Sequence, residues 1–523
     1  MQYINLQERK KRLRLIRFLF PFITALLFSV SFAPFHPFLR FFIFLAFIPF
    51  LWAVLHCKKR VFLTGFIFGF LSNVGVFWWI STLIVEDVSR ILIASGVVVL
   101  ILYLSFYWGL VALLISKVKK ISPTIAIFSF PFFWISFEFF RSLTSQLGFP
   151  WCSVGYSLSN IPSMIQIASI TGISGLGFSI LIFNSLIYWS ITRKHRKRMI
   201  LGLCFFICLF ILQAASGNLI ISTAKKGETV SVSLVQANIL PEVKRGNEVD
   251  ERLSILRSLT LDSAIRGSDL IVWSETSIPC YYRESSGCIK RIKNLVKEIG
   301  IPLVAGAPEY VGERKAKKRF IYNSAFLISD AGKTIGRYRK IYLVPFGEHL
   351  PFDNTFPVLR KIHLGQGDFS PGREFTVLSQ GRFKFSVLIC FESIFPRLVR
   401  KFVRNGAELL VNITEDSWFG KTSGPYQHAE MAIMRAVENR VSVARCGNTG
   451  ISMLVDPYGR VLKTSKIFER IIIEGEIPLR RGTSFYTRFG DLFAWVIVAI
   501  SILLFIFPLV AAPFKVRKST LAG

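Results

Sequence analysis

The chain has 523 residues, of which 52% are hydrophobic and 51 are phenylalanine, and its mean hydropathy is +0.48. These values are too high for an ordinary soluble enzyme and exclude a single water-soluble domain. The formal net charge is +32, but no nucleic-acid-binding motif accompanies it, so we expect no nucleic-acid partner. The excess of basic charge reflects either general basicity or attraction to anionic phospholipid headgroups.

Apolar segments long enough to cross a bilayer gather at the two ends of the chain. We predict eight membrane-spanning helices, at about 15–33, 39–56, 61–85, 91–116, 121–140, 163–191, 199–217 and 491–514. No small-residue cleavage site follows the first of them, so we expect an anchor and not a removed signal peptide. The predicted division is a membrane domain at 1–217, a non-membrane domain at 218–489, and an eighth helix with a short tail at 490–523.

Lysine and arginine gather in every second connection between the predicted spans. The basic clusters lie at 9–17, 58–60, 117–120, 193–198 and 515–518, whereas the connections at 34–38, 86–90 and 141–162 carry almost no basic residues. The positive-inside rule then places both termini in the cytoplasm. Residues 218–489 are therefore expected outside the cytoplasm.

The expected extracytoplasmic region alternates between strand-like and helix-like patterns. Strands are expected at 229–236, 268–275, 302–306, 322–328, 334–338, 387–390, 407–413, 441–446, 451–455 and 460–463, and helices at about 249–265, 287–299, 394–405 and 425–440. This alternation, with a hairpin, predicts a layered α/β domain built on a mixed sheet.

Four of the eight cysteines lie in this region, at Cys280, Cys288, Cys390 and Cys446. An extracytoplasmic compartment is oxidising, so Cys280 and Cys288 either pair across a short loop or stay as two free thiols. No CxxC or HxxxH spacing indicates zinc, so we expect no metal site.

Three side chains suited to acyl transfer stand near the ends of predicted strands. Glu275 and Cys390 each close an apolar strand, and Lys340 lies in the run from Tyr338 to Glu348. Transfer through a thioester needs a base near the thiol, a donor or cation for the oxyanion, and a proton for the leaving group. Taken singly, a buried cysteine is more often a packing residue and a glutamate at a strand end a solvated charge, so the combination carries the hypothesis.

The same segments carry a family resemblance. Trp273-Ser274-Glu275-Thr276, the run from Tyr338 to Glu348, and Cys390-Phe391-Glu392 resemble the three signatures of the nitrilase superfamily. Within that superfamily the chain resembles the bacterial apolipoprotein N-acyltransferases, also over Gly148-Phe149-Pro150-Trp151 and Asp416-Ser417-Trp418-Phe419-Gly420. The resemblance implies an α-helical multi-span membrane domain joined to a nitrilase-like αββα sandwich, in the bacterial inner membrane with the sandwich in the periplasm.

The resemblance also implies roles for single residues. Glu275 would be the general base, Lys340 the oxyanion stabiliser and Cys390 the nucleophile, with Glu348 and Glu392 in support. The implied reaction moves an acyl chain from a membrane phospholipid, phosphatidylethanolamine, to the N-terminal amine of diacylglyceryl-cysteine lipoproteins. It requires no metal or organic cofactor, and we expect a monomer.

Further residues are candidates for substrate contact or support. The substrate-binding candidates are Trp418, Phe391, Asn412, Phe149 and Trp151. The aromatic connection at 141–162 suits the membrane interface, or alternatively forms a structural re-entrant loop. We expect Glu138 and Arg141 to form a structural ion pair, and we interpret His428 as a supporting hydrogen-bond donor.

Two other functions remain open at the level of sequence. One is a membrane-anchored amidase of the nitrilase type, which would hydrolyse a small amide. The other is a membrane module without catalysis, such as a transporter subunit or scaffold; the retained Glu275, Lys340 and Cys390 disfavour it.

Overall fold

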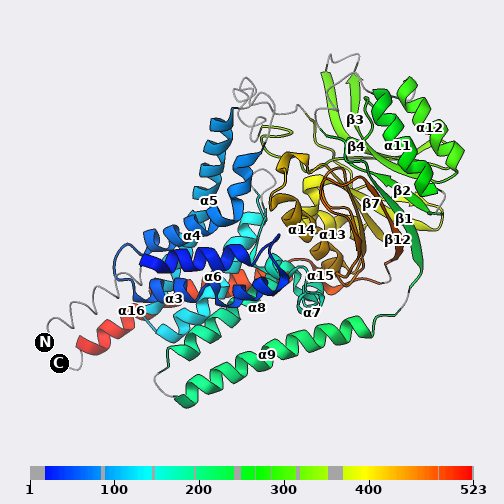
Figure 1. Ribbon diagram of the computed structural model, residues 1–523. Coiled ribbons are helices and arrows are strands. Elements are labelled where there is room, and N and C mark those ends of the chain that lie inside the picture. The colour runs from blue at the N-terminus through cyan, green and yellow to red at the C-terminus, as the bar shows by residue number, and fades with distance from the viewer. Residues whose placement is uncertain are drawn as a thin grey trace.

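The computed structural model describes residues 18–520 except 84–88, 144–147, 194–195, 226, 241–248, 265–266, 284–285, 314–317, 351–368 and 481. The predicted basic cluster at 9–17 and the start of the first predicted span lie outside the described residues. Two parts are visible in Figure 1, a bundle of apolar helices and a domain of two β-sheets beside it.

Among the residues that the structure describes, six helical segments are long and apolar enough to cross a membrane. They are Pro37–His56 (η1 Pro37–Phe42, α2 Ile43–Ala46 and α3 Ile48–His56), Val61–Thr82 (α4 Val61–Phe77 and η2 Trp78–Thr82), α5 Arg90–Lys119, α6 Pro123–Leu143, α8 Ala168–Ile191 and α9 Arg196–Ser222. Two shorter apolar helices, Phe18–Val30 and Leu492–Ile506, stand at the first and eighth predicted spans. The multi-span class is therefore confirmed, with eight as an approximate count.

Aromatic side chains fill the core of the bundle. Phe47, Phe50 and Trp108 pack around Trp134, with ring centroids 4.5 Å apart between the two tryptophans. By contrast, α9 leaves most of its apolar residues exposed, and only 6% of its most apolar stretch is buried. An apolar surface of this extent is suited to lipid and not to water.

Two six-stranded sheets form the second domain. One has the order β12-β1-β2-β3-β4-β5 and the other β11-β10-β9-β8-β7-β6. The strands are β1 Thr229–Gln236, β2 Leu270–Trp273, β3 Leu303–Glu313, β4 Lys318–Ile328, β5 Thr334–Arg339, β6 Leu378–Gln380, β7 Phe383–Ile389, β8 Leu409–Thr414, β9 Ser442–Gly447, β10 Met453–Val455, β11 Val461–Thr464 and β12 Ile471–Pro478. Parallel pairs (β1–β2–β3 and β7–β8–β9) form the centre of each sheet, and antiparallel strands flank them.

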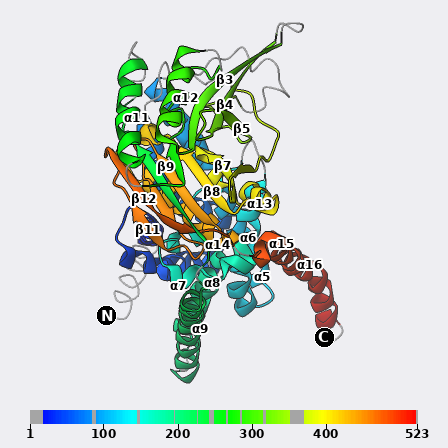
Figure 2. The same ribbon diagram turned by 90° about the vertical axis from the view of Figure 1, so that its right-hand side faces the viewer.

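Helices cover the outer face of each sheet, which gives the predicted αββα order (Figure 2). The first sheet is covered by α11 Val249–Ala264 and α12 Gly287–Ile299, and the second by α13 Pro396–Arg404 and α14 Gly424–Asn439. Of these helices, α14 also packs against α8 of the bundle. One hydrophobic core therefore runs from the second sheet through α14 into the membrane helices.

Most predicted elements are present within a few residues of their expected ends, but two details differ. The sequence pattern missed β6 and β12, both at sheet edges. Gly172, at φ +65°, interrupts the helix predicted over 163–191, because only glycine adopts this conformation readily. Cys280 and Cys288 form a disulfide, which decides between the two alternatives left open for these thiols.

Candidate active site

Cys390 stands where β7 ends and a short 3-10 turn, η5 (Cys390–Ile394), begins. Its φ is +51°, a conformation that costs a non-glycine residue energy and persists only where the surroundings hold it. Its carbonyl oxygen lies 3.0 Å from the Ser393 hydroxyl, which donates to it. The side chain is 9% exposed, so the thiol lies at the end of the sheet, shielded from most solvent.

Glu275 follows β2 and is almost fully buried. Its Oε2 accepts a hydrogen bond of 2.8 Å from the backbone N–H of Glu415. Gly306 on β3 makes room for this turn, because a Cβ there would lie 2.9 Å from the Cα of Glu275. A glycine at this position therefore lets the carboxylate sit against the neighbouring strand.

Lys340 follows β5, and its ammonium meets two carboxylates. Nζ lies 2.9 Å from Oε1 of Glu348 and 3.5 Å from Oε1 of Glu275. Asn323 on β4 donates to the same two oxygens at 2.8 Å each. Glu348 also accepts from the N–H of Val344 at 2.8 Å. The four side chains form a closed hydrogen-bonded network that holds the ammonium in one place.

The charges of this network act on the thiol. Burial raises the pKa of the Cys390 thiol well above its ordinary value, and Glu275 raises it further, whereas Lys340 lowers it. Burial also raises the pKa of the Glu275 carboxyl, against the charge of Lys340. Burial alone lowers the pKa of Lys340, but Glu348 and Glu275 outweigh burial, so this pKa is raised. The site therefore holds a neutral thiol beside a permanent cation.

Glu392 joins the cysteine turn to the lysine loop. Its Oε2 accepts from the N–H of Ile389, and its Oε1 accepts from the Tyr338 hydroxyl and the N–H of Ile341, at 2.6 to 2.8 Å. Burial raises the pKa of this carboxyl to about 7, although the bond from Tyr338 lowers it. Glu392 thus fixes the two loops relative to one another.

A second buried network lies beside Cys390 and was not predicted from the sequence beyond His428. Asp416 accepts from Arg445 at 2.8 Å and lies 2.9 Å from Nδ1 of His428. Arg445 and His428 outweigh burial and lower the pKa of Asp416 to about 2. Gly450 is required here, because a Cβ would lie 2.2 Å from the Asp416 carboxylate. The glycine-containing run Asn448-Thr449-Gly450 was the available signal.

Donor atoms of Cys390, Asp416 and His428 lie within 4.8 Å of one another, the kind of group that can hold a metal ion. Arg445 already donates to Asp416 and lies 3.2 Å from Nδ1 of His428. A metal ion there would therefore meet a buried like charge, so these residues fit a hydrogen-bonded network better than a metal centre.

The connection between α6 and α8 reaches the cysteine turn from the membrane side. Trp151 is 2% exposed; its indole N–H donates to Gln427 at 2.9 Å, and its ring lies 5.5 Å from that of His428. Trp79 of η2 donates to the same Gln427 oxygen at 3.2 Å. The connection is therefore packed between the bundle and α14, which favours the structural alternative over an exposed interfacial loop.

The five substrate-binding candidates occupy different environments. Trp418 is 43% exposed, whereas Phe391 packs on Phe395 with ring centroids 5.1 Å apart. Asn412 is fully buried and bonded to Leu388 and Arg445. Phe149 packs on Phe77 and Trp151. Of the five, Trp418 is the most exposed, and Asn412 is hydrogen-bonded within the buried core.

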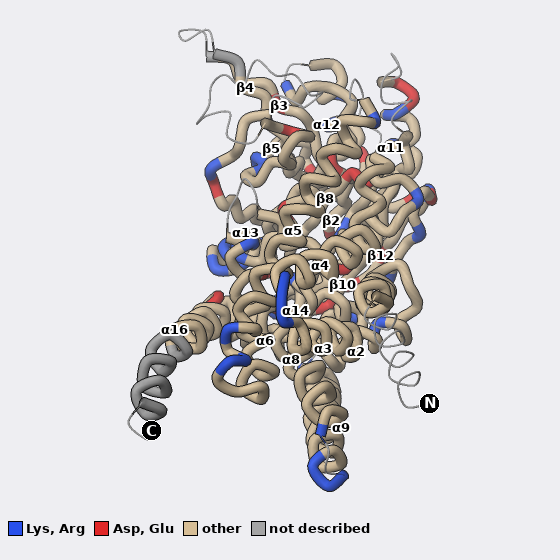
Figure 3. The backbone as a smooth tube through the Cα atoms, turned by 90° about the vertical axis from the view of Figure 1, so that its left-hand side faces the viewer, with Lys and Arg blue, Asp and Glu red and all other residues tan. Residues whose placement is uncertain are grey.

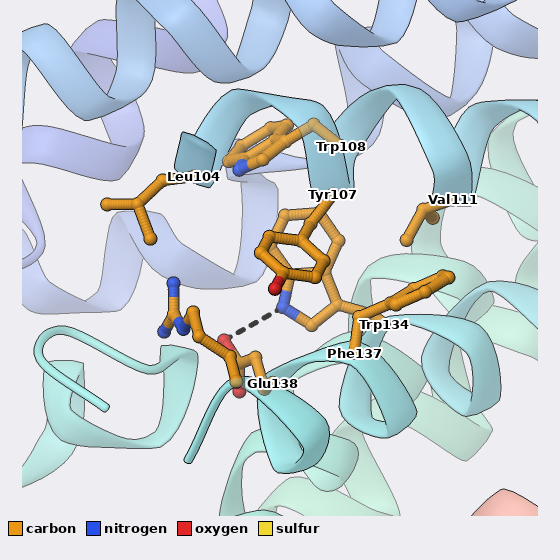
Figure 4. A pocket seen from close by; sticks show the side chains of 8 residues that line it. Leu104, Tyr107, Trp108, Val111, Trp134, Phe137 and Glu138 are labelled. Carbon is orange, nitrogen blue, oxygen red and sulfur yellow. Dashed lines mark hydrogen bonds between the residues drawn. The ribbon is translucent and has the colours of Figure 1, made fainter. Parts of the chain in front are cut away.

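Glu138 and Arg141 do not pair as expected. Glu138 accepts from the Trp134 indole at 2.9 Å and from the N–H of Val154 at 3.0 Å, while Arg141 donates to Ser153 at 3.4 Å. Both side chains thus bind the connection after α6, and no ion pair joins them among the residues that the structure describes. They line a small hollow between α5 and α6 (Figure 4).

Two family models match the two parts of the chain. The family model "Apolipoprotein N-acyltransferase N-terminal domain" matches residues 24–186, and the carbon-nitrogen hydrolase model matches residues 231–486. Among solved structures, Saccharomyces cerevisiae Nit3, described as a member of branch 10 of the nitrilase superfamily, has a TM-score of 0.39 and 23% sequence identity. That match covers 48% of this chain and 92% of Nit3.

Relatives of the whole chain are more similar. The apolipoprotein N-acyltransferase of Geobacter metallireducens is 36% identical over 468 residues, 87% of this chain and 89% of its own length. That of Chlorobaculum tepidum is 33% identical over 72% of this chain and 75% of its own length. Matches of this identity extend through both the membrane bundle and the two-sheet domain, and the chain belongs to the apolipoprotein N-acyltransferase family.

Proposed function

We propose that this chain transfers an acyl chain from a membrane phospholipid to the N-terminal amine of diacylglyceryl-cysteine lipoproteins, through a thioester on Cys390. The observation that carries the proposal is the buried network of Glu275, Lys340 and Glu348 at the sheet ends beside that thiol. One base, one fixed cation and one nucleophile are what the two half-reactions need.

In the first half-reaction Cys390 attacks the ester carbonyl of the donor, and Glu275 takes the thiol proton. The raised pKa of Glu275 makes its carboxylate a stronger base than an ordinary glutamate, which suits a general base. The Lys340 ammonium stabilises the oxyanion of the tetrahedral intermediate. When the intermediate collapses, the ester C–O bond breaks, Glu275 returns the proton to the leaving oxygen, and a lysophospholipid departs.

In the second half-reaction the lipoprotein amine attacks the thioester carbonyl. Glu275 takes a proton from the amine, Lys340 again stabilises the oxyanion, and the C–S bond breaks. The amide product leaves, and the proton on Glu275 returns to the Cys390 sulfur. Phosphatidylethanolamine, cut at its sn-1 ester, is the proposed donor.

The membrane bundle supports a lipid donor. Each methylene taken from hydrocarbon into water costs about 0.8 kcal/mol, so a site held beside the bilayer lets the acyl tails stay in the membrane. We assign residues 1–217 and 490–523 to the membrane part and 218–489 to a periplasmic catalytic part. The Cys280–Cys288 disulfide supports an oxidising compartment for the latter.

Trapping the acyl-enzyme tests the proposal. The purified protein is incubated with phosphatidylethanolamine labelled in its acyl chain, and the Cys390 peptide is examined by mass spectrometry. We expect a hydroxylamine-labile adduct that a diacylglyceryl-cysteine peptide discharges as it becomes N-acylated. Cys446→Ser is the matched control, because Cys446 is a buried thiol whose Sγ lies against backbone carbonyls.

The outcomes separate the alternatives. The Cys390→Ser variant should form no thioester, and near-normal turnover of that variant would remove Cys390 from the nucleophile role. An adduct discharged by water alone would instead favour a membrane-anchored amidase or other hydrolase of the nitrilase type.

A further inference from the structure

The helix α14 touches both the cysteine turn and the membrane loops, and two consecutive residues of it face one side each. Gln427 accepts hydrogen bonds from Trp79 and Trp151 on the membrane side. His428 faces the cysteine turn, with Nε2 at 3.2 Å from the carbonyl oxygen of Cys390 and 3.2 Å from the Ser393 hydroxyl. The proposed reaction does not use either side chain chemically.

The imidazole of His428 has a defined orientation. Burial and then the charge of Arg445 lower its pKa, so at neutral pH the ring carries one proton. Asp416, 2.9 Å from Nδ1, accepts a hydrogen bond from the proton on that nitrogen. Nε2 is then an acceptor 3.2 Å from the Ser393 hydroxyl, whose single proton is shared between Nε2 and the Cys390 carbonyl. The groups that face the ring are therefore Asp416 and Arg445 on one edge and Ser393 with the Cys390 carbonyl on the other.

Aromatic rings from two segments lie against this imidazole. The Trp151 ring centroid is 5.5 Å from that of His428 at an interplanar angle of 32°. Phe419 meets the imidazole edge-on at 6.1 Å and also packs against Trp79 at 5.0 Å. His428 is 1% exposed. A shift of Trp151 would therefore displace the imidazole, because a close-packed site has no free volume to absorb the movement.

We infer that His428 is a positioning residue, through which Trp151 of the membrane connection sets the conformation of the Cys390 turn. The turn is in a conformation with positive φ that needs such support. The inference rests on the proposed function only in taking Cys390 as the nucleophile. The position of the connection between α6 and α8 thereby controls the reactivity of the Cys390 thiol before any substrate binds.

Alkylation of Cys390 by iodoacetamide, in the purified full chain without added lipid donor, measures this reactivity directly. The rate is read from the Cys390 peptide by mass spectrometry at one fixed pH. His428→Leu should lower the rate by about tenfold or more, within the range of coupling between residues in contact. Trp151→Leu should lower it several-fold in the parent and have no further effect in the His428→Leu background.

Two polar variants distinguish positioning from simple packing. Glutamine at 428 can place an amide where Nε2 lies, whereas asparagine reaches only the position of Nδ1, near Asp416. His428→Gln should therefore keep the alkylation rate within about threefold of the parent. His428→Asn should lower the alkylation rate as far as His428→Leu does. Met431→Leu, also buried on α14, is the matched control and should leave the rate unchanged.

The inference is overturned if the effects of the Trp151 and His428 variants on the alkylation rate are additive. If Trp151→Leu and His428→Leu lower the rate independently, or if Gln and Asn at 428 are equal, His428 does not transmit the position of Trp151. A Trp151→Leu variant with normal thiol reactivity and a raised KM for phospholipid would assign Trp151 to substrate contact alone. Since alkylation requires no acyl transfer, these outcomes are independent of whether the acyl-enzyme of the proposed function is found.

Discussion

The charges of Lys340 and Glu348 influence the pH at which Glu275 can act as a general base. Glu275 is influenced by Lys340, which lowers its pKa, and by Glu348, which raises it. A general base must be ionised to accept a proton, so the rate of acyl-enzyme formation should rise with pH through the raised pKa of Glu275.

Glu348→Gln should move this rise of the rate with pH, the acid limb of the pH profile, to lower pH. Removing the Glu348 charge removes one cause that raises the pKa of Glu275, and it leaves Lys340 to act on Glu275 alone. The measurement is the pH dependence of kcat/KM for the phospholipid donor. Glu298→Gln is the control, since Glu298 forms an exposed pair with Arg257 on the far helices. A limb that moves to higher pH, or by the same amount in both variants, contradicts the prediction.

Trp418 should act on substrate and not on the thiol. It is the most exposed of the candidate substrate residues, at 43%, so its removal disturbs few internal contacts. We expect Trp418→Ala to raise KM for one of the two substrates by about tenfold, because an aromatic contact is lost, with Cys390 alkylation unchanged. Equal loss of alkylation would show that Trp418 holds the site together.

At the scale of elements, α14 is the structural link between the two parts. Arg40 of η1 makes a two-pronged ion pair with Glu430, with one contact of 2.8 Å, in the buried interface. Further along α14, Arg435 donates to the Tyr156 hydroxyl at 2.9 Å, and Glu438 accepts from the N–H of Ile173. Each of these contacts joins α14 to a membrane helix or its connection.

Arg40→Met should destabilise the protein more than the double variant Arg40→Met/Glu430→Met. The single change leaves a largely buried carboxylate without its cation, which typically costs about 3–5 kcal/mol, whereas the double change removes both charges. Thermal unfolding in detergent provides the comparison. Arg257→Met, which breaks the exposed pair with Glu298, should shift the midpoint little. If the double variant is the less stable of the two, the pair itself stabilises the interface.

The sequence predicted local elements well and long-range partners poorly. The boundaries of α11, α12 and β1 agree with the predicted ranges to within one residue, because hydrophobic periodicity is a local signal. The pairing of Arg40 with Glu430 crosses 390 positions, and neither residue stands in a pattern that reveals the other. The same holds for Arg445 and Asp416, whose side chains meet only after β8 and β9 have paired. Catalytic candidates were found because they stand at strand ends and match family signatures.

At the scale of the whole molecule, the basic residues indicate an orientation. Figure 3 shows lysine and arginine at the end of α9 that points away from the two-sheet domain, and this helix begins at Arg196. The predicted clusters at 58–60 and 117–120 also flank bundle helices. By the positive-inside rule we expect the two-sheet domain to face the periplasm.

Single cysteines tested in intact spheroplasts check this orientation. A cysteine replacing the exposed Lys297 on α12 should react with a membrane-impermeant maleimide in intact spheroplasts. A cysteine replacing the exposed Lys59, between α3 and α4, should react only after permeabilisation. The parent chain provides the background, because it has cysteines of its own. The reverse pattern would place the two-sheet domain in the cytoplasm.

The pairing of β1 with β12 bears on the order in which the molecule is completed during synthesis. β1 follows directly after α9, and β12 precedes α15 (Phe485–Phe489) and α16 (Leu492–Thr520). The two strands lie side by side from Thr229–Pro478 to Gln236–Ile471. Until the ribosome has made β12, one side of β1 is an open sheet edge, which invites wrong pairing. The sheet that contains β1 is therefore completed only after β12, which comes last among the described strands, has been synthesised.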